Sequence, residues 1–282
     1  MAVVRCRARR LALDRAQIMG VINVTPDSFS DGGNLLTPRG EPDLDRIERV
    51  ARSMLAAGAT LLDIGGESTR PGAPDVPEAA ELARVIPVME RLRGLDTLLS
   101  VDTRKPMVAR AALEAGAHLV NDVSGGEAEG MLDVVAGMRA GICLMHMQGT
   151  PGSMQDAPAY GDVVGEVADY LAARARAAQL AGISGESIVV DPGIGFGKTL
   201  AHNLALLAGL PVLVGIGYPV LIGVSRKSLL GRITGREVAE RMVGGAVMAA
   251  LAVERGARVI RTHDVAPTRD ALAVVQALSG VT

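Results

Sequence analysis

The sequence of 282 residues has no tryptophan, only two cysteines and no long apolar run. Cys6 and Cys143 lie outside any CxxC or metal-ligand spacing, which argues against a disulfide framework or a structural zinc site and favours a reducing cytoplasm. No run approaches the ~18 apolar residues of a membrane span, and the arginine-rich start lacks the apolar stretch of a secretory signal. The formal net charge of -2 gives no broad basic field for nucleic acid. We therefore expect a globular protein that binds neither membranes nor nucleic acid.

Two other residue types are so scarce that their few positions are informative. Of the 29 basic residues, only Lys105, Lys198 and Lys227 are lysines. A drift towards arginine explains the composition as a whole, but a compact, titratable ammonium cannot always be replaced by a guanidinium. The only phenylalanines, Phe29 and Phe196, fall in glycine-rich loops and not in periodic apolar runs. This placement favours contact with a ligand over anchoring of the loops.

Short apolar runs alternate with helical patterns along the whole chain. Eight runs are typical of buried parallel strands, at 18–22, 60–64, 97–101, 118–120, 142–145, 187–190, 220–224 and 258–260. Amphipathic helices are expected at 44–57, 106–116, 162–180, 237–255 and 268–278. The pattern predicts an α/β protein with a single (β/α)8 TIM barrel over residues 1–282 and a short N-terminal β-hairpin within 1–17 that closes its floor. A doubly wound open sheet is the alternative.

Two places in this pattern are less regular. Pro87 is expected to kink or divide the helical segment that precedes the third strand. The segment 200–219 fits either a helix or an extra strand at 212–216. We predict a helix there, because 220–224 has the better strand ending.

Polar side chains follow every predicted strand, at the end where such barrels place their chemistry. They are Asn23, Asp63 with Glu67, Asp102, Asn121, His146, Asp191, Ser225 with Lys227, and Arg261 with His263. One buried carboxylate at a strand end could serve only backbone donors, but eight polar strand ends in register favour a binding site.

Acceptors among these residues suit a flat, nitrogen-rich heterocycle. Asp102, Asn121 and Asp191 offer oxygens that can take parallel N–H donors from an amino-pyrimidinone edge. Lys227 would supply the opposing donor.

Donors suited to a phosphate-like anion lie at other positions of the same rim. Arg70, Arg261 and His263 are such donors. Asn23 offers an amide oxygen to a hard cation such as Mg²⁺, which keeps waters and bridges phosphates. The four histidines give no zinc pattern.

Three glycine-rich loops stand out. The loops 23–33 and 67–72 stand out for length and glycine, where ~2–6 residues are usual for such connections. They are predicted to be mobile lids, with ordinary connections as the alternative. The string GIGFGK at 193–198 lacks the spacing and the Ser/Thr of a P-loop, which we reject. Ser228 is expected to begin a helix, whose first amides favour a carboxylate.

Eight strings resemble, in order, the motifs of the dihydropteroate synthases, over residues 18–265. They are IMGVINVTPDSFSDGG at 18–33, DIGGESTRPG at 63–72, SVDT at 100–103, NDVSGG at 121–126, MHMQGTP at 145–151, DPGIGFGK at 191–198, GVSRKS at 223–228 and RTHDV at 261–265.

The resemblance implies a transferase that condenses 6-hydroxymethyl-7,8-dihydropterin pyrophosphate with 4-aminobenzoate, giving 7,8-dihydropteroate and pyrophosphate in folate biosynthesis. It also implies Mg²⁺, inhibition by sulfonamides and a homodimer. The residues it places around the pterin are Asp102, Asn121, Met145, Asp191 and Lys227. Those around the pyrophosphate are Asn23 (also the metal ligand), Thr69, Arg70, Arg261 and His263. Those around 4-aminobenzoate are Phe29, Thr69, Pro71, Phe196, Lys227 and Ser228. Asp27, Arg70 and Lys227 would act in catalysis, Asp27 by stabilising the cation when its loop closes.

Three other functions would also fit part of this sequence. A methyltetrahydrofolate-binding corrinoid methyltransferase domain would share the acceptors but does not need Arg70 or the first loop. A non-catalytic pterin-binding paralogue should show eroded loop motifs, and these are intact. An aldolase with a Schiff base on Lys227 would need a desolvated lysine, which the neighbouring Ser225 and Arg226 do not suggest.

Overall fold

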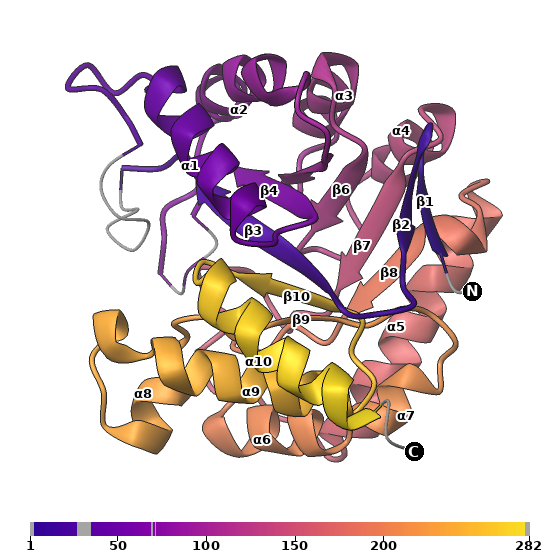
Figure 1. Cartoon of the computed structure of the whole chain (residues 1–282). Helices are drawn as coiled ribbons and strands as arrows, with labels where there is room; N and C mark the ends of the chain where they lie inside the picture. The colour runs from indigo at the N-terminus through magenta and orange to yellow at the C-terminus, as the bar shows by residue number, and fades with distance from the viewer. Residues whose placement is uncertain (1–2, 27–34, 69, 71, 280–282) are drawn as a thin grey trace.

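The computed structural model describes residues 3–26, 35–68, 70 and 72–279. Within these residues, eight parallel strands form one sheet in the order β8-β7-β6-β5-β4-β3-β10-β9. A bridge between Val190 and Val220 joins the two outer strands, so the sheet closes into a barrel (Figure 1). The strands are β3 (Gln17–Asn23), β4 (Leu61–Gly65), β5 (Leu98–Asp102), β6 (Leu119–Asp122), β7 (Gly141–Met145), β8 (Ile188–Asp191), β9 (Leu221–Gly223) and β10 (Val259–Thr262). The predicted barrel is confirmed.

Helices surround the outside of this barrel (Figure 1). They are α1 (Leu44–Ala56), α2 (Glu78–Leu92), α3 (Pro106–Ala115), α4 (Met131–Gly137), α5 (Val163–Leu180), α6 (Leu200–Ala208), α7 (Leu210–Val214), α8 (Ser228–Thr234), α9 (Met242–Glu254) and α10 (Val265–Ser279), with short 3-10 turns η1 (Gly185–Ser187) and η2 (Val238–Glu240). In the part of the chain described, none of these helices is long and apolar enough to cross a membrane.

A two-stranded antiparallel hairpin closes the floor of the barrel. It consists of β1 (Val3–Cys6) and β2 (Arg9–Ala12). Its buried side chains Val4, Cys6 and Leu11 form one apolar cluster with one inward-facing residue of each barrel strand, such as Met19 and Leu61. The hairpin therefore closes the barrel at the N-terminal ends of its strands, as predicted. The end at which the strands finish remains open.

Strand alternation decides which side chains point into the barrel. In β4, Leu62 and Ile64 belong to the outer core beneath the helices, and Leu61 belongs to the inner cluster. Because successive side chains of a strand point to opposite faces, Asp63 faces inwards above Leu61. The same alternation turns Asp102 and Ser100 of β5 inwards, since Leu99 and Val101 lie in the outer core.

The structure also shows what forms at the two irregular places of the sequence pattern. The segment 200–219 contains helices α6 and α7 and no extra strand, which confirms the predicted helix. Of the two outcomes expected at Pro87, a kink or a division, the division does not occur. Helix α2 continues past Pro87, because Val85, Val88 and Met89 are buried against the barrel and hold the helix together.

The helix expected at 237–255 is in fact divided. Its first turn forms η2, and α9 begins only at Met242. Arg241 lies between them and donates to the carbonyls of Arg226 and Arg236. Through Arg241, the segment between η2 and α9 is hydrogen-bonded to the loop that follows β9.

Candidate active site

The open end of the barrel contains a cavity of about 450 Å³. Its wall includes eight residues that the sequence assigned to the site: Asn23, Arg70, Asp102, Phe196, Lys227, Ser228, Arg261 and His263. It also includes residues for which no substrate contact was predicted: Thr25, Glu67, Ser68, Met154, Gly195, Ser225, Arg226 and Val238. The polar strand ends therefore converge as expected.

Arg261 joins two carboxylates across the inside of the barrel. Its Nε donates to Asp63 Oδ2 at 2.7 Å, and its Nη2 donates to Asp102 Oδ2 at 2.7 Å. Asn121, the register partner of Asp102, donates through Nδ2 to Asp63 Oδ2 at 3.0 Å. Asp63 was predicted only as a polar strand end, although a carboxylate facing inwards from an otherwise apolar strand was the available signal for a role in the site.

Three buried acceptors in this cluster have no hydrogen-bond partner among the described residues. They are Asp63 Oδ1, Asp102 Oδ1 and the hydroxyl of Ser100, the register partner of Asp63. A buried oxygen without a hydrogen-bond donor destabilises the folded protein by about 1–3 kcal/mol. A ligand that donates to this oxygen removes the penalty when it binds. This cluster is suited to a ring edge that carries several N–H donors.

Burial and mutual charge shift the titration of these groups. Burial raises the pKa of Asp102 to about 7, against the pull of Arg261, and the charge of Asp63 adds to the rise. Burial also raises the pKa of Asp191, opposed by Lys227 and by the hydrogen bond that Gly193 N donates at 2.7 Å. Burial alone would lower the pKa of Arg261, but Asp63 and Asp102 outweigh it and raise that pKa, so the guanidinium stays charged.

Lys227 is a further cation in the wall of the cavity. Its ammonium donates to the carbonyl of Ile194 and lies 4.7 Å from the ring centroid of Phe196. Burial lowers the pKa of Lys227 to about 8, although Asp191 opposes the shift. The expectation that this lysine lacks a desolvated environment is therefore wrong. Ile194 and Phe196, which contact this ammonium, lie in the loop after β8 and not next to Lys227 in sequence.

That loop is held in place by a second buried lysine. Lys198 Nζ contacts the carbonyl of Phe196 at 2.9 Å, and His146 through Nδ1 at 2.9 Å and its carbonyl at 3.3 Å. All three acceptors are uncharged, and burial lowers the pKa of Lys198 to about 7. His146, predicted only as a polar strand end, therefore holds Lys198 and the loop after β8 in place and does not line the cavity.

A glycine allows this loop to pass close to His146. Gly193 has a φ of +68°, and a Cβ on it would lie 2.0 Å from the carbonyl oxygen of His146. No larger residue fits there without a shift of the backbone.

Asn23 and His263 meet at the rim of the cavity. Asn23 Nδ2 lies 3.4 Å from His263 Nε2, and His263 Nδ1 lies 3.1 Å from Ser225 Oγ. The tautomer with its proton on Nδ1 satisfies both contacts. Burial and the nearby Arg261 and Arg226 lower the pKa of His263 to about 3, so its ring is neutral. Its interaction with an anion is therefore that of a dipole and not of a cation.

The remaining predicted residues fall in three groups. Asn121, Asp191 and Met145 are buried, and Met145 is the register partner of Asp191. Ser228 begins α8, as predicted, and is exposed. Asp27, Phe29, Thr69 and Pro71 lie outside the described residues, as does most of the first loop predicted to be a lid.

Comparison with known proteins agrees with this geometry. Residues 19–263 match the family described as pterin binding enzyme. The Escherichia coli (strain K12) dihydropteroate synthase is 44% identical over 276 residues, covering 95% of this chain and 93% of that protein. The Neisseria meningitidis serogroup C dihydropteroate synthase is 48% identical over 272 residues, covering 95% and 94%.

Solved structures give the same result in three dimensions. The Yersinia pestis dihydropteroate synthase in a sulfonamide drug complex superposes with a TM-score of 0.93 at 44% identity, covering 99% of each chain. The Burkholderia cenocepacia dihydropteroate synthase complexed with 7,8-dihydropteroate superposes with a TM-score of 0.88 at 48% identity, covering 99% of this chain and 97% of that one. The chain therefore belongs to the pterin-binding enzyme family and, within it, to the dihydropteroate synthases.

Proposed function

We propose that this chain joins the methylene carbon of 6-hydroxymethyl-7,8-dihydropterin pyrophosphate to the amino nitrogen of 4-aminobenzoate, as a step of folate biosynthesis. The observation that carries the proposal is the cluster of Asp63, Asp102 and Asn121 around Arg261 inside the barrel, with buried acceptor atoms that lack partners among the described residues. The relative from Burkholderia cenocepacia solved with 7,8-dihydropteroate supports the product. One from Xanthomonas albilineans solved with 4-aminobenzoic acid supports the second substrate.

The pterin ring would occupy the interior of the barrel. Asp102 and Asp191 accept from its amino and ring N–H groups, while Asn121 can both donate and accept. Lys227 donates from the opposite side, and Met145 supplies apolar contact beside Asp191. Asp63 adds a carboxylate that keeps Arg261 in position.

The pyrophosphate would lie towards the rim, among Arg70, Arg261 and His263, with Thr69 assigned there by the resemblance alone. Arg70 is exposed and lines the cavity, so its guanidinium can reach an anion from the solvent side.

Mg²⁺ agrees with the residues at this rim. The contact with His263 uses the amide nitrogen of Asn23, so Asn23 Oδ1 is the atom that would ligate the ion. The described residues contain no cluster of three or more His, Cys, Asp or Glu side chains that could hold a metal. One neutral oxygen is compatible with an ion that takes its other ligands from phosphate and water. When bound, Mg²⁺ neutralises charge on the leaving pyrophosphate.

The reaction breaks one bond and forms another. The bond from the methylene carbon to the pyrophosphate oxygen breaks, and its electron pair leaves with the pyrophosphate. The nitrogen lone pair of 4-aminobenzoate then bonds to this carbon, and the nitrogen releases a proton to solvent. Arg70 and Arg261 stabilise the negative charge on the leaving group, and the electron-rich pterin stabilises the cation-like carbon. Asp27 is assigned to the same cation by the resemblance.

The 4-aminobenzoate would enter above the pterin. Phe196, Lys227 and Ser228 line the cavity on this side, and the resemblance adds Phe29, Thr69 and Pro71. The Ser228 hydroxyl and the Lys227 ammonium are the donors available to the carboxylate.

A homodimer is part of the proposal. On α9, the side chains of Val243, Val247 and Leu251 recur every four residues and are exposed. Such a stripe on one helix face favours burial against a second copy of the chain. Light scattering should give the mass of a dimer for the native protein and of a monomer for Val247→Arg, while a monomeric native protein would rule this part out.

The function is tested by mixing the pterin pyrophosphate, 4-aminobenzoate and Mg²⁺ with the purified protein. Release of pyrophosphate together with formation of 7,8-dihydropteroate is expected. Transfer of a methyl group from methyltetrahydrofolate to a corrinoid, without pyrophosphate release, would favour the methyltransferase alternative. Pterin binding without turnover would favour a non-catalytic paralogue.

A further inference from the structure

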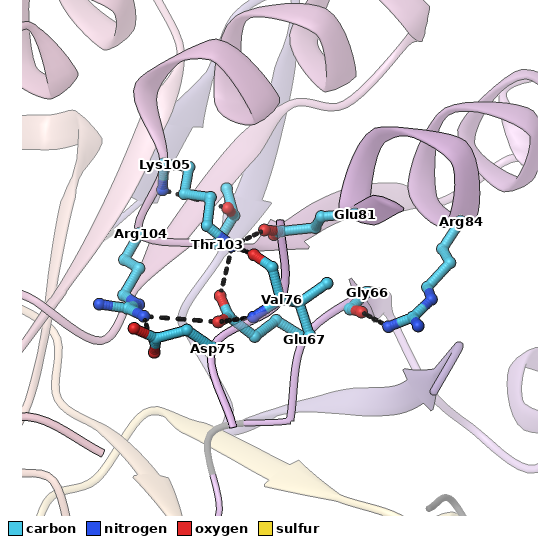
Figure 2. A network of polar contacts seen from close by, with 9 residues as sticks. All are labelled: Gly66, Glu67, Asp75, Val76, Glu81, Arg84, Thr103, Arg104 and Lys105. Carbon is cyan, nitrogen blue, oxygen red and sulfur yellow. Dashed lines mark hydrogen bonds and ion pairs between the residues drawn. The ribbon is translucent and has the colours of Figure 1, made fainter. Parts of the chain in front are cut away.

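A network of ion pairs lies at the base of the loop that carries Arg70 (Figure 2). Its centre is Lys105, in the connection between β5 and α3. Lys105 Nζ donates to Glu67 Oε2 at 2.8 Å, to Glu81 Oε2 at 2.6 Å and to the carbonyl of Val76 at 2.7 Å. All three protons of one ammonium are therefore used, on acceptors from different parts of the chain.

Two of these acceptors are the two ends of the Arg70 loop. Glu67 begins it and Val76 ends it, and Glu67 Oε1 also accepts from Val76 N at 3.1 Å. Arg104 adds a bond to Asp75 Oδ1 at 2.7 Å and a longer one to Glu67 Oε1 at 3.4 Å. The base of the loop is thus closed on itself and tied to the next strand.

The third acceptor fixes this base to the barrel. Glu81 is on α2, and its side chain is fully buried. Burial alone would lower the pKa of Lys105, but Glu67 and Glu81 outweigh it and raise that pKa, so the ammonium remains charged at neutral pH. A planar guanidinium cannot direct donors at three acceptors placed around a tetrahedral nitrogen. This is a physical reason for a lysine here in a chain with only three lysines among its 29 basic residues.

We propose that Lys105 is a positioning residue for the reaction, which fixes both ends of the 67–76 loop and thereby sets the place of Arg70 at the cavity. Glu67 and Arg70 line the cavity, whereas Lys105 does not, so Lys105 acts through the loop and not by contact with substrate. The inference rests on the proposed role of Arg70 in binding the pyrophosphate.

The test uses the charge-balanced double variant Lys105→Met/Glu81→Gln, which removes one cation and one anion together and avoids an unpaired buried charge. Inhibition by inorganic pyrophosphate, in the presence of Mg²⁺, should weaken about 10- to 100-fold, because a displacement near 1 Å has effects of this size. Affinity for the pterin alcohol, which has no phosphate, should change by less than about twofold at pH 8, where Asp102 is mostly ionised with or without the charge of Glu81. The matched control is Arg91→Met/Glu48→Gln, which removes an ion pair between α1 and α2 that does not touch the loop. It should leave both quantities unchanged.

Arg70→Ala separates this inference from the function on which it rests. If Arg70→Ala leaves pyrophosphate inhibition unchanged, the proposed role of Arg70 is wrong, and that of Lys105 with it. If Arg70→Ala weakens inhibition but the Lys105 variant does not, only the inference about Lys105 is overturned. If Lys105 acts through Arg70, its variant should have no added effect on inhibition in the Arg70→Ala background. Full additivity would contradict the proposal.

If the double variant fails to fold, a variant that keeps the positive charge at position 105 still tests the proposal. Lys105→Arg should fold and still weaken pyrophosphate inhibition, with pterin alcohol binding retained. Native inhibition in a folded Lys105→Arg protein, or an equal loss of affinity for the pterin alcohol, would overturn the assignment.

Discussion

Arg261 and Asp63 are hydrogen-bonded across the inside of the barrel, from β10 to β4, at 2.7 Å. The same Asp63 oxygen accepts from Asn121. One buried carboxylate therefore fixes both a cation and an amide of the proposed pterin site.

Replacing Asp63 by asparagine should weaken this arrangement. The amide oxygen could still accept from both Arg261 and Asn121, but the negative charge that pairs with the buried Arg261 guanidinium would be lost. Breaking a buried ion pair by removing one partner costs about 3–5 kcal/mol, and because Arg261 keeps Asp102 we expect a value near the lower limit. Urea unfolding measures this loss. Ser100→Ala, which removes an unpartnered buried hydroxyl next to Asp63, should change the free energy of unfolding by no more than about 1 kcal/mol. Equal stabilities for the two variants would contradict the role of Asp63.

Turnover should depend on the pterin contacts in the barrel. Lys227→Ala and Asp191→Ala should each lower kcat by about 10²–10³-fold or more, since each removes a charged group from a water-poor site. Initial rates of pyrophosphate release measure the effect, and circular dichroism checks that the variants fold. A native rate from Asp191→Ala would refute the pocket assignment.

Pterin binding should strengthen as the pH rises from 6 to 8. The pKa of Asp102 is raised from 3.8 to about 7, so its carboxylate is mostly protonated at pH 6 and mostly ionised at pH 8. Only the ionised form accepts two parallel N–H donors, and the gain is at most about tenfold per pH unit. Titration calorimetry with the pterin alcohol measures it. In the Asp102→Asn variant, pterin affinity should depend less on pH, and any dependence that comes from titration of the ligand itself should remain. If its affinity depends on pH as strongly as that of the native protein, another group is responsible.

Lys198 should make the folded protein more stable as the pH rises above 7. Its pKa is about 7 in the folded protein, below the ordinary 10.5. Between these values the unfolded chain binds more protons, so the free energy of unfolding increases with pH, by at most about 1.4 kcal/mol per unit. Below pH 7 the lysine is charged in both states, and the cost of its burial is fully present. Urea unfolding at pH 7 and pH 9 should show a smaller gain for Lys198→Met than for the native protein, and identical gains would refute the assignment.

Sulfonamides should inhibit the enzyme in competition with 4-aminobenzoate, which they resemble in shape and charge. The Yersinia pestis relative solved with a sulfonamide drug supports this expectation. Initial rates at several concentrations of 4-aminobenzoate distinguish competitive inhibition from other modes. Insensitivity to sulfonamides would require a different location for the second substrate.

The sequence by itself determined the barrel and the convergence of its polar strand ends. Apolar runs at the spacing of βα units define the eight strands, and each strand that ends in a polar residue delivers it to the same rim. Asp102 and Asn121 could be placed together in this way, because register and alternation are local properties of neighbouring strands. The helix start at Ser228 was also predictable, because where a helix begins depends on the local sequence.

Only the tertiary structure decided which of these groups pair and how strongly they are buried. Asp63 and Arg261 are 198 positions apart, and nothing in either segment identifies the other as its partner. Burial lowers the pKa of Lys227, whose contacts include Ile194 and Phe196 of the loop after β8. Lys105 binds its three acceptors only because α2 and the Arg70 loop fold against the connection that follows β5. Pairing and desolvation depend on distances across the fold, which a sequence pattern does not contain.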